Sequence, residues 1–170
     1  NLINSSDKES LLTEFQDVQP MDFDIKIPRF VFIIIRNMFK SGAMELTPLE
    51  EELINKFLPG LMTIILKKNE KISSLICNGG DYVGIRIPDN KDLIDIINKL
   101  GRPVISTSAN ISDNDVITRV DMIDEELLKN IDYVEDGGEV ISLSSSVVRI
   151  VDDELVVLRE GTLSDDIKAY

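Results

Sequence analysis

Side chains able to bind a charged or polar substrate gather in one stretch of the chain, residues 84–112. Arg86 ends an apolar segment there, and a second apolar segment at residues 104–105 runs into a loop that contains Ser108 and Asn110. A guanidinium can hold a carboxylate or a phosphate through paired hydrogen bonds, while hydroxyl and amide groups donate and accept without adding charge. This stretch is therefore the first place to look for a binding site.

Two strands and a helix would have to position these groups. The pattern of Lys91–Leu100 predicts an amphipathic helix, with one strand before it and another after it. A strand–helix–strand unit is typical of an open α/β sheet, in which ligands gather where loops leave the carboxyl ends of strands. We therefore expect the polar loop after residue 105 to carry chemistry, in one concave site with Arg86.

The residue counts narrow the chemistry. The 170 residues suit one domain, and they include no histidine and a single cysteine, Cys77. Serine–histidine triads, cysteine–histidine dyads and histidine-bearing metal motifs are excluded, and a structural zinc site is not expected. Catalysis would depend on carboxylates, lysine, arginine, hydroxyls, backbone amides or a metal that arrives with the substrate.

Charge and hydropathy limit the partners. The formal net charge is −13, which opposes nucleic-acid phosphates unless basic residues form a local patch, and the densest basic cluster is Lys67, Lys68 and Lys71. The longest apolar run, Phe30–Ile35, is far shorter than the ~20 residues that cross a bilayer. The polar opening residues do not resemble a secretory signal. We therefore expect a cytoplasmic protein with no membrane contact.

The rest of the chain mixes helices and strands. A helix is expected within residues 1–20, and Arg29–Lys40 reads as a strand or a helix, with its β-branched content favouring a strand. Thr47 and Pro48 predict the start of a second helix. Further strands are expected at residues 61–66 and 82–87, an acidic helix at 121–129, a hairpin over 146–159 and a short last helix that Ser164 caps. The expected fold is a single α/β domain with a twisted mixed parallel and antiparallel sheet flanked by helices.

Six segments resemble, in order, motifs of the YrdC-like family, whose best-known members are the threonylcarbamoyl-AMP synthases. They are KFLPGLMTIIL at 56–66, YVGIRIP at 82–88, STSANIS at 106–112, DGG at 136–138, SSVV at 145–148 and LREG at 158–161. The resemblance implies a YrdC-like α/β domain over residues 44–170. Residues 1–43 lack the family's Y-P-T-[DE]-T and K-x-R motifs, and are expected to form an atypical N-terminal segment packed on the same domain.

The resemblance also implies a reaction. L-Threonine, bicarbonate and ATP would give threonylcarbamoyl-AMP and pyrophosphate, for the N6-threonylcarbamoyladenosine of transfer RNA. ATP would enter with Mg²⁺ as a substrate complex, with no protein-bound metal and with no side chain assigned as acid, base or nucleophile. The residues implied for threonine are Arg86, Ser108 and Ser145, and those implied for the nucleotide are Tyr82, Asn110 and Arg159.

Structural alternatives stay open for each residue. Arg86 could pair with Asp81 or Asp89, the polar loop could be a turn that bonds its own backbone, and Arg159 could be a solvated strand end. Because the N-terminal motifs are missing, the chain could also be a catalytically impaired relative that binds nucleotide or double-stranded RNA, or a partner-binding scaffold. Whether it forms a homodimer is left open.

Overall fold

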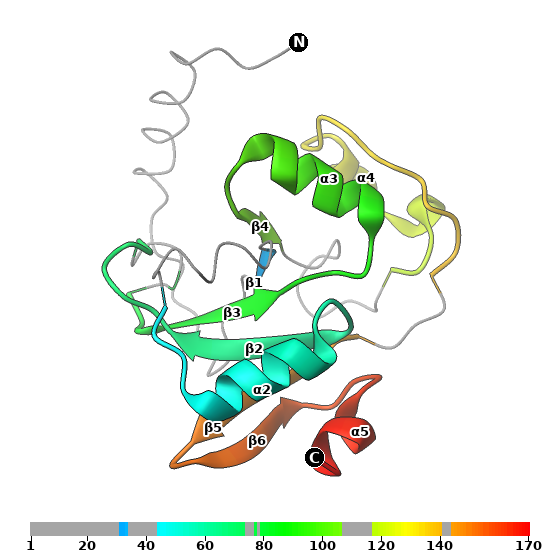
Figure 1. Cartoon of the computed structure of the whole chain (residues 1–170). Coiled ribbons are helices and arrows are strands. Elements are labelled where there is room, and N and C mark those ends of the chain that lie inside the picture. Colours follow the sequence, from blue (N-terminus) through cyan, green and yellow to red (C-terminus); the bar gives the residue numbers. More distant parts are fainter. Residues whose placement is uncertain (1–30, 34–43, 74–76, 78, 107–116, 141–143) are drawn as a thin grey trace.

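One mixed sheet of six strands organises the domain (Figure 1). The computed structural model describes residues 31–33, 44–73, 77, 79–106, 117–140 and 144–170. In spatial order the strands are β4 (Val104–Ser106), β1 (Val31–Ile33), β3 (Tyr82–Arg86), β2 (Met62–Lys67), β5 (Ser146–Val151) and β6 (Glu154–Arg159). Two neighbouring pairs, β1 with β3 and β2 with β5, are parallel, and the other pairs are antiparallel. The expected mixed sheet with flanking helices is confirmed.

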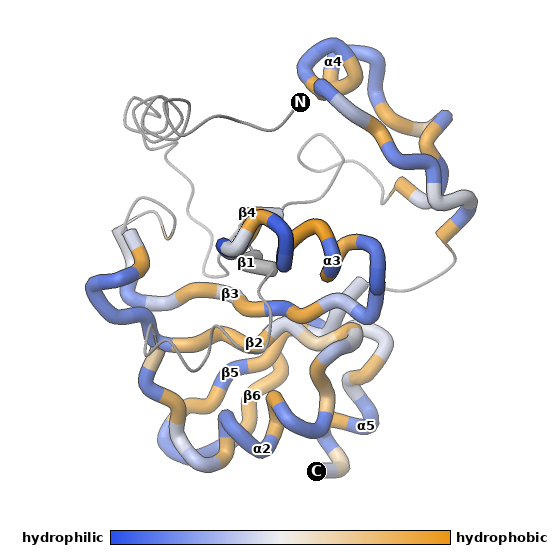
Figure 2. The backbone as a smooth tube through the Cα atoms, turned by 45° about the horizontal axis from the view of Figure 1, so that its top comes forward, coloured by the Kyte–Doolittle hydropathy of each residue, from blue (hydrophilic) through white to orange (hydrophobic). Residues whose placement is uncertain are grey.

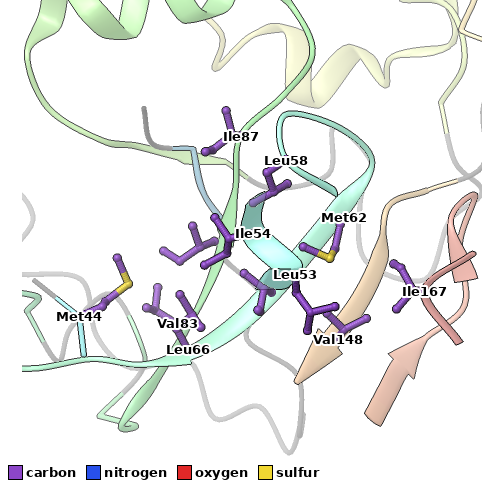
Figure 3. Close-up of a cluster of buried hydrophobic side chains, with 12 residues drawn as sticks. Met44, Leu53, Ile54, Leu58, Met62, Leu66, Val83, Ile87, Val148 and Ile167 are labelled. Atoms are coloured by element: carbon purple, nitrogen blue, oxygen red, sulfur yellow. The ribbon is translucent and has the colours of Figure 1, made fainter. Parts of the chain in front are cut away.

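The helix after Thr47 is present, and it builds the main core. α2 (Pro48–Phe57) starts with a capping box, in which Thr47 and Glu50 bond each other's backbone N–H groups. Its apolar side packs on one face of the sheet, where Leu53 and Ile54 meet Val83 and other buried strand residues (Figure 3). α5 (Ser164–Lys168) adds Ile167 to the same cluster. This face of the sheet is therefore closed by hydrophobic packing.

The β5–β6 hairpin also forms as expected. Asp152 and Asp153 form its turn with positive φ angles of 50° and 63°, the conformation of a tight two-residue hairpin. The apolar character of the central strand β2 is visible along most of its length (Figure 2). The helix expected within residues 1–20 lies outside the described residues, so it stays a prediction.

The strand–helix–strand expectation needs a correction. α3 (Lys91–Leu100) has the expected bounds, with Asn90 as its N-cap and Gly101 in the left-handed conformation at its end. However, β3 and β4 are not neighbours, because β1 lies between them, parallel to β3 and antiparallel to β4. β4 consequently runs opposite to β3, and its last residue, Ser106, lies level with Gly84 through Val31. β4 therefore ends on the Tyr82 side of Arg86 and not level with it.

Two smaller expectations are also wrong. The acidic segment 121–129 is not one helix but a 3-10 turn, η3 (Val120–Met122), followed by a short α4 (Glu125–Leu128) that Asp124 caps. Ser164 is not the cap of α5 but its first residue, and its hydroxyl accepts a hydrogen bond from the Gly161 N–H at 2.8 Å. The latter bond ties the loop after β6 to the last helix.

Candidate functional site

The sheet face opposite to α2 carries most of the charge in the central strands. Side chains alternate along a strand, so with Val83 and Ile85 in the core, Tyr82, Gly84 and Arg86 belong to the other face. The same alternation places Arg149 there on β5, and a register irregularity between Val147 and Val148 pairs Arg159 on β6 with Val147 of the same face. We call this side the arginine face, defined by Arg86, Arg149 and Arg159 together with their neighbours in register, which are Thr63, Ile65, Lys67, Tyr82, Gly84, Val147, Val151, Glu154 and Val156.

Arg86 and Arg159 lie in one row across four strands. Val147 pairs with Thr63 on one side and with Arg159 on the other. Thr63 precedes Ile64 and Arg86 follows Ile85, so the antiparallel Ile64–Ile85 pair places Thr63 opposite Arg86. Three strand spacings of ~4.8 Å separate the two arginine backbones. Thr63 and Val147 therefore lie between two guanidinium-bearing side chains.

A hydrogen-bonded chain through Ser145 joins Arg159 to Thr63 of this row. Arg159 Nη2 donates to the main-chain oxygen of Ser145 at 3.0 Å and to its hydroxyl at 3.1 Å. The Ser145 hydroxyl also shares a 2.9 Å hydrogen bond with the buried Thr63 hydroxyl. Ser145 is itself only 6% exposed, so both hydroxyls are held in fixed positions. Arg159, by contrast, is an exposed residue whose guanidinium reaches back over this pair.

Arg86 is the more buried of the two cations. Its Nε donates to the Gly60 carbonyl at 3.4 Å, and the Gly60 N–H in turn donates to the carbonyl of Ile87 at 2.9 Å. Burial, and secondarily repulsion from Arg159, lower the pKa of Arg86 from its ordinary value. The alternative partners Asp81 and Asp89 form no ion pair with it, and within the described ranges neither Arg86 nor Arg159 has a carboxylate partner. Two nearby cations without a counter-charge form a site that suits an anion.

Close packing fixes the serine segment, residues 144–146, beside this site. The hydroxyl of Ser146 accepts from the Leu163 N–H at 3.1 Å and shares a 3.0 Å bond with Ser164. A Cβ added to Gly161 would lie 2.3 Å from the Ser144 carbonyl oxygen and 2.5 Å from the Ser146 nitrogen. Only glycine permits this approach of the loop after β6, so the LREG segment and the serine segment hold each other in place.

Tyr82 lies at the other end of β3 from Arg86. The guanidinium carbon of Arg149 lies 3.7 Å from the centroid of the Tyr82 ring, a cation–π contact between two strands that are not adjacent. Sequence reasoning did not single out Arg149. A detectable signal was present, since an arginine interrupts the otherwise apolar strand Ser146–Val151 at a position that alternates with Val148 in the core.

The structure thus brings together Arg86, Ser145 and Arg159, and it places Tyr82 two residues from Gly84 on the same face. Ser108 and Asn110 lie outside the described residues, so their part in the site stays a prediction. An RNA-binding patch would need several basic residues on one face. Lys67 and Arg86 share the arginine face by alternation, whereas Arg102 follows α3 in a turn. The double-stranded RNA alternative stays a prediction as well.

In the part of the chain that the structure describes, no three His, Cys, Asp or Glu side chains are grouped as metal ligands. None of the helices in the same residues has the length and apolar character of a membrane span.

Comparisons with known proteins point to one family. Residues 31–161 match the Sua5/YciO/YrdC family model, whose description reads "Telomere recombination". The chain is similar to a Methanocaldococcus jannaschii protein that carries the provisional name threonylcarbamoyl-AMP synthase, with 45% identity over 117 residues, 68% of this chain and 54% of that protein. It is 33% identical over 137 residues to the Pyrococcus abyssi threonylcarbamoyl-AMP synthase, covering 80% of this chain and 40% of that protein.

Among solved structures, the fold is similar to the crystal structure of P. abyssi Sua5 complexed with L-threonine. The TM-score is 0.74 at 26% identity, over 96% of this chain and 48% of that chain. The chain spans about half, or less, of the length of these similar proteins.

Proposed function

The chain belongs to the Sua5/YciO/YrdC family, and from this premise we propose that it binds L-threonine and ATP on its arginine face and joins them with bicarbonate to give threonylcarbamoyl-AMP. The names of its relatives support the reaction. The product would serve the N6-threonylcarbamoyladenosine modification of transfer RNA. Mg²⁺ enters this proposal with ATP, as part of the substrate.

One observation carries the proposal. Arg86 and Arg159 lie in one row, the fixed hydroxyl of Ser145 bonds both Arg159 and Thr63 of that row, and neither guanidinium has a carboxylate partner among the described residues. Both substrates carry anionic groups, the carboxylate of threonine and the phosphates of ATP. A row with two unneutralised cations therefore matches the charges that must be brought together.

The geometry suggests a role for each side chain. Arg86, half-buried beside the Gly60 carbonyl, holds the threonine carboxylate, and Ser145 holds the same substrate through its hydroxyl. Arg159 bonds Ser145 directly, so it lies where the reacting ends of the two substrates must meet, next to the α-phosphate. Tyr82, Ser108 and Asn110 keep their expected roles as nucleotide and threonine contacts.

The chemistry needs no acid, base or nucleophile from the protein. The threonine amine and bicarbonate form a carbamate with loss of water. A carbamate oxygen then attacks the α-phosphorus, the bond from that phosphorus to the bridging oxygen breaks, and pyrophosphate leaves with the electron pair. Preorganised guanidinium donors stabilise the negative charge that develops on the α-phosphate, and positioning of the two substrates supplies much of the remaining acceleration.

Pyrophosphate release tests the proposal. The purified chain is given Mg²⁺ and ATP with and without L-threonine and bicarbonate, beside Arg86→Ala and the matched control Arg119→Ala. Arg119 is an exposed arginine that pairs with Asp121 away from the strands of the arginine face. We expect release that needs both co-substrates, falls about 10²-fold or more in Arg86→Ala and is unchanged in the control. Release independent of threonine, or equal in the two variants, would overturn the proposal.

A further inference from the structure

Arg149 is a third cation on the arginine face, one step along the strands from the row that holds Arg86 and Arg159. Gly84 pairs with Ile65, Ile65 with Arg149, and Arg149 with Val156. On β2, β3 and β5 this row lies two residues, or ~6.7 Å, from the first, and on β6 the register irregularity adds one residue between them. An elongated anion bound over the first row could therefore extend over the second.

Tyr82 holds the Arg149 guanidinium in a defined orientation. The guanidinium carbon is 3.7 Å from the ring centroid, which places the planar group against the ring face. On β3 the residue between Tyr82 and Arg86 on this face is Gly84, which has no side chain. A cation held in this way loses little additional side-chain entropy when it binds a ligand.

Arg149 has a buried polar atom without a hydrogen-bond partner. Its Nε is buried and forms no hydrogen bond, and Arg149 makes no ion pair with any residue that the structure describes. The strands β2, β3, β5 and β6 contain a single carboxylate, Glu154, which pairs with Val151 a further row away. Buried polar groups on charged side chains are normally bonded, so this one calls for a missing partner, and a negatively charged one suits it.

We propose that Arg149, oriented by the Tyr82 ring, is an anion contact for the outer phosphates of the bound nucleoside triphosphate. The inference rests on the proposed function, because it takes the α-phosphate to lie at Arg159 in the first row. The β- and γ-phosphates then continue along the strand direction to the second row. Arg149 thereby favours a triphosphate over a monophosphate and holds the pyrophosphate group that leaves.

Nucleotide selectivity tests the inference. Dissociation constants are measured by calorimetry for MgATP, AMP and pyrophosphate with the wild-type chain and with Arg149→Met, which keeps a long apolar stem but no charge. Loss of one charge-assisted contact weakens binding by about tenfold to 100-fold. We expect that loss for MgATP and pyrophosphate, and no change for AMP. The control Arg119→Met should change none of the three.

Two further variants separate an anion contact from a structural role. Arg149→Lys keeps the charge without the planar fork, so it should retain part of the preference for ATP over AMP. This variant keeps the test usable if Arg149→Met does not fold. Tyr82→Phe keeps the ring and should retain more of that preference than Tyr82→Thr, which removes it. Equal losses for ATP and AMP in Arg149→Met, or a full ATP affinity in that variant, would overturn the subsite.

The outcomes also distinguish the two proposals. A wild-type chain that binds neither MgATP nor pyrophosphate overturns both of them. Pyrophosphate binding that is lost in Arg149→Met, in a chain that shows no threonine-dependent turnover, supports the anion subsite and overturns only the synthase reaction. Threonine-dependent turnover with unchanged ATP affinity in Arg149→Met overturns only the subsite.

Discussion

Arg159 bonds Ser145 twice through one guanidinium nitrogen, once to its main-chain oxygen at 3.0 Å and once to its hydroxyl at 3.1 Å. The contact joins the end of β6 to the residue before β5. It also couples the proposed nucleotide contact to the proposed threonine contact, because neither side chain can move without disturbing the other. The consequences of this coupling are measurable.

Replacing Arg159 with lysine should weaken nucleotide binding even though the charge is kept. An ammonium group cannot reproduce the planar fork that reaches Ser145 and a phosphate at the same time. We expect about tenfold weaker binding of ATP and AMP alike, since both carry the α-phosphate. Calorimetric titration checks this, with Arg119→Lys as the control. A loss confined to ATP would place Arg159 at the outer phosphates instead.

Ser145→Ala should affect both stability and threonine use. Thr63 is a buried residue, only 1% exposed, and the variant leaves its hydroxyl without the 2.9 Å hydrogen bond to Ser145. The free energy of unfolding should fall by about 1–3 kcal/mol, and the KM for threonine should rise. Denaturant titration and steady-state kinetics measure the two effects. Ser144→Ala, at an exposed position in the same segment, is the control and should change neither. An unchanged KM for threonine in Ser145→Ala would remove Ser145 from the site.

Gly161→Ala should disturb the serine segment directly. The added methyl carbon would lie 2.3 Å from the Ser144 carbonyl oxygen and 2.5 Å from the Ser146 nitrogen, both of which belong to the backbone. We expect a loss of about 1–3 kcal/mol in the free energy of unfolding, because the backbone must shift. Gly137→Ala meets no atom within 4 Å and provides the matched control in the melting experiment. Equal melting temperatures for the two variants would contradict the close approach.

Cys77, the single thiol of the chain, offers a test of burial by pH. Burial raises the pKa of the Cys77 thiol above its ordinary value, and the nearby Lys68 offsets only part of this effect. At a pH near or below the ordinary thiol pKa, the folded chain should therefore be alkylated more slowly than the denatured chain. The rate should rise as the pH passes through the raised pKa. Equal rates for the folded and denatured chains at pH 8 would contradict the burial of this thiol.

Local patterns predicted the local elements well. Thr47 and Pro48 mark the start of α2, residues 91–100 have the spacing of α3, and the paired aspartates fit the hairpin turn. Each of these depends on neighbours in the sequence, such as caps and turn residues. Short motifs likewise identified Arg86, Ser145 and Arg159; the sheet brings the two arginines into one row, and hydrogen bonds join Ser145 to Arg159.

Long-range pairing was the part that the sequence did not reveal. The apolar run around β1 has no decisive period, and nothing in it shows that the strand would separate β3 from β4. The direction of β4, and with it the position of its last residue, Ser106, follows from that insertion. Arg149 was missed for a related reason, since its partner Tyr82 is 67 positions away and two strands across.

Isotope incorporation tests the central claim most directly. The chain is incubated with Mg²⁺, ATP, L-threonine and ¹³C-labelled bicarbonate, and the adenylate fraction is analysed by mass spectrometry, beside Arg86→Ala and Arg119→Ala. The account predicts a threonylcarbamoyl-AMP peak that carries one ¹³C atom, persists in Arg119→Ala and is lost in Arg86→Ala. A chain that binds MgATP and threonine yet forms no labelled adenylate would contradict it, as would a labelled product of equal yield in Arg86→Ala.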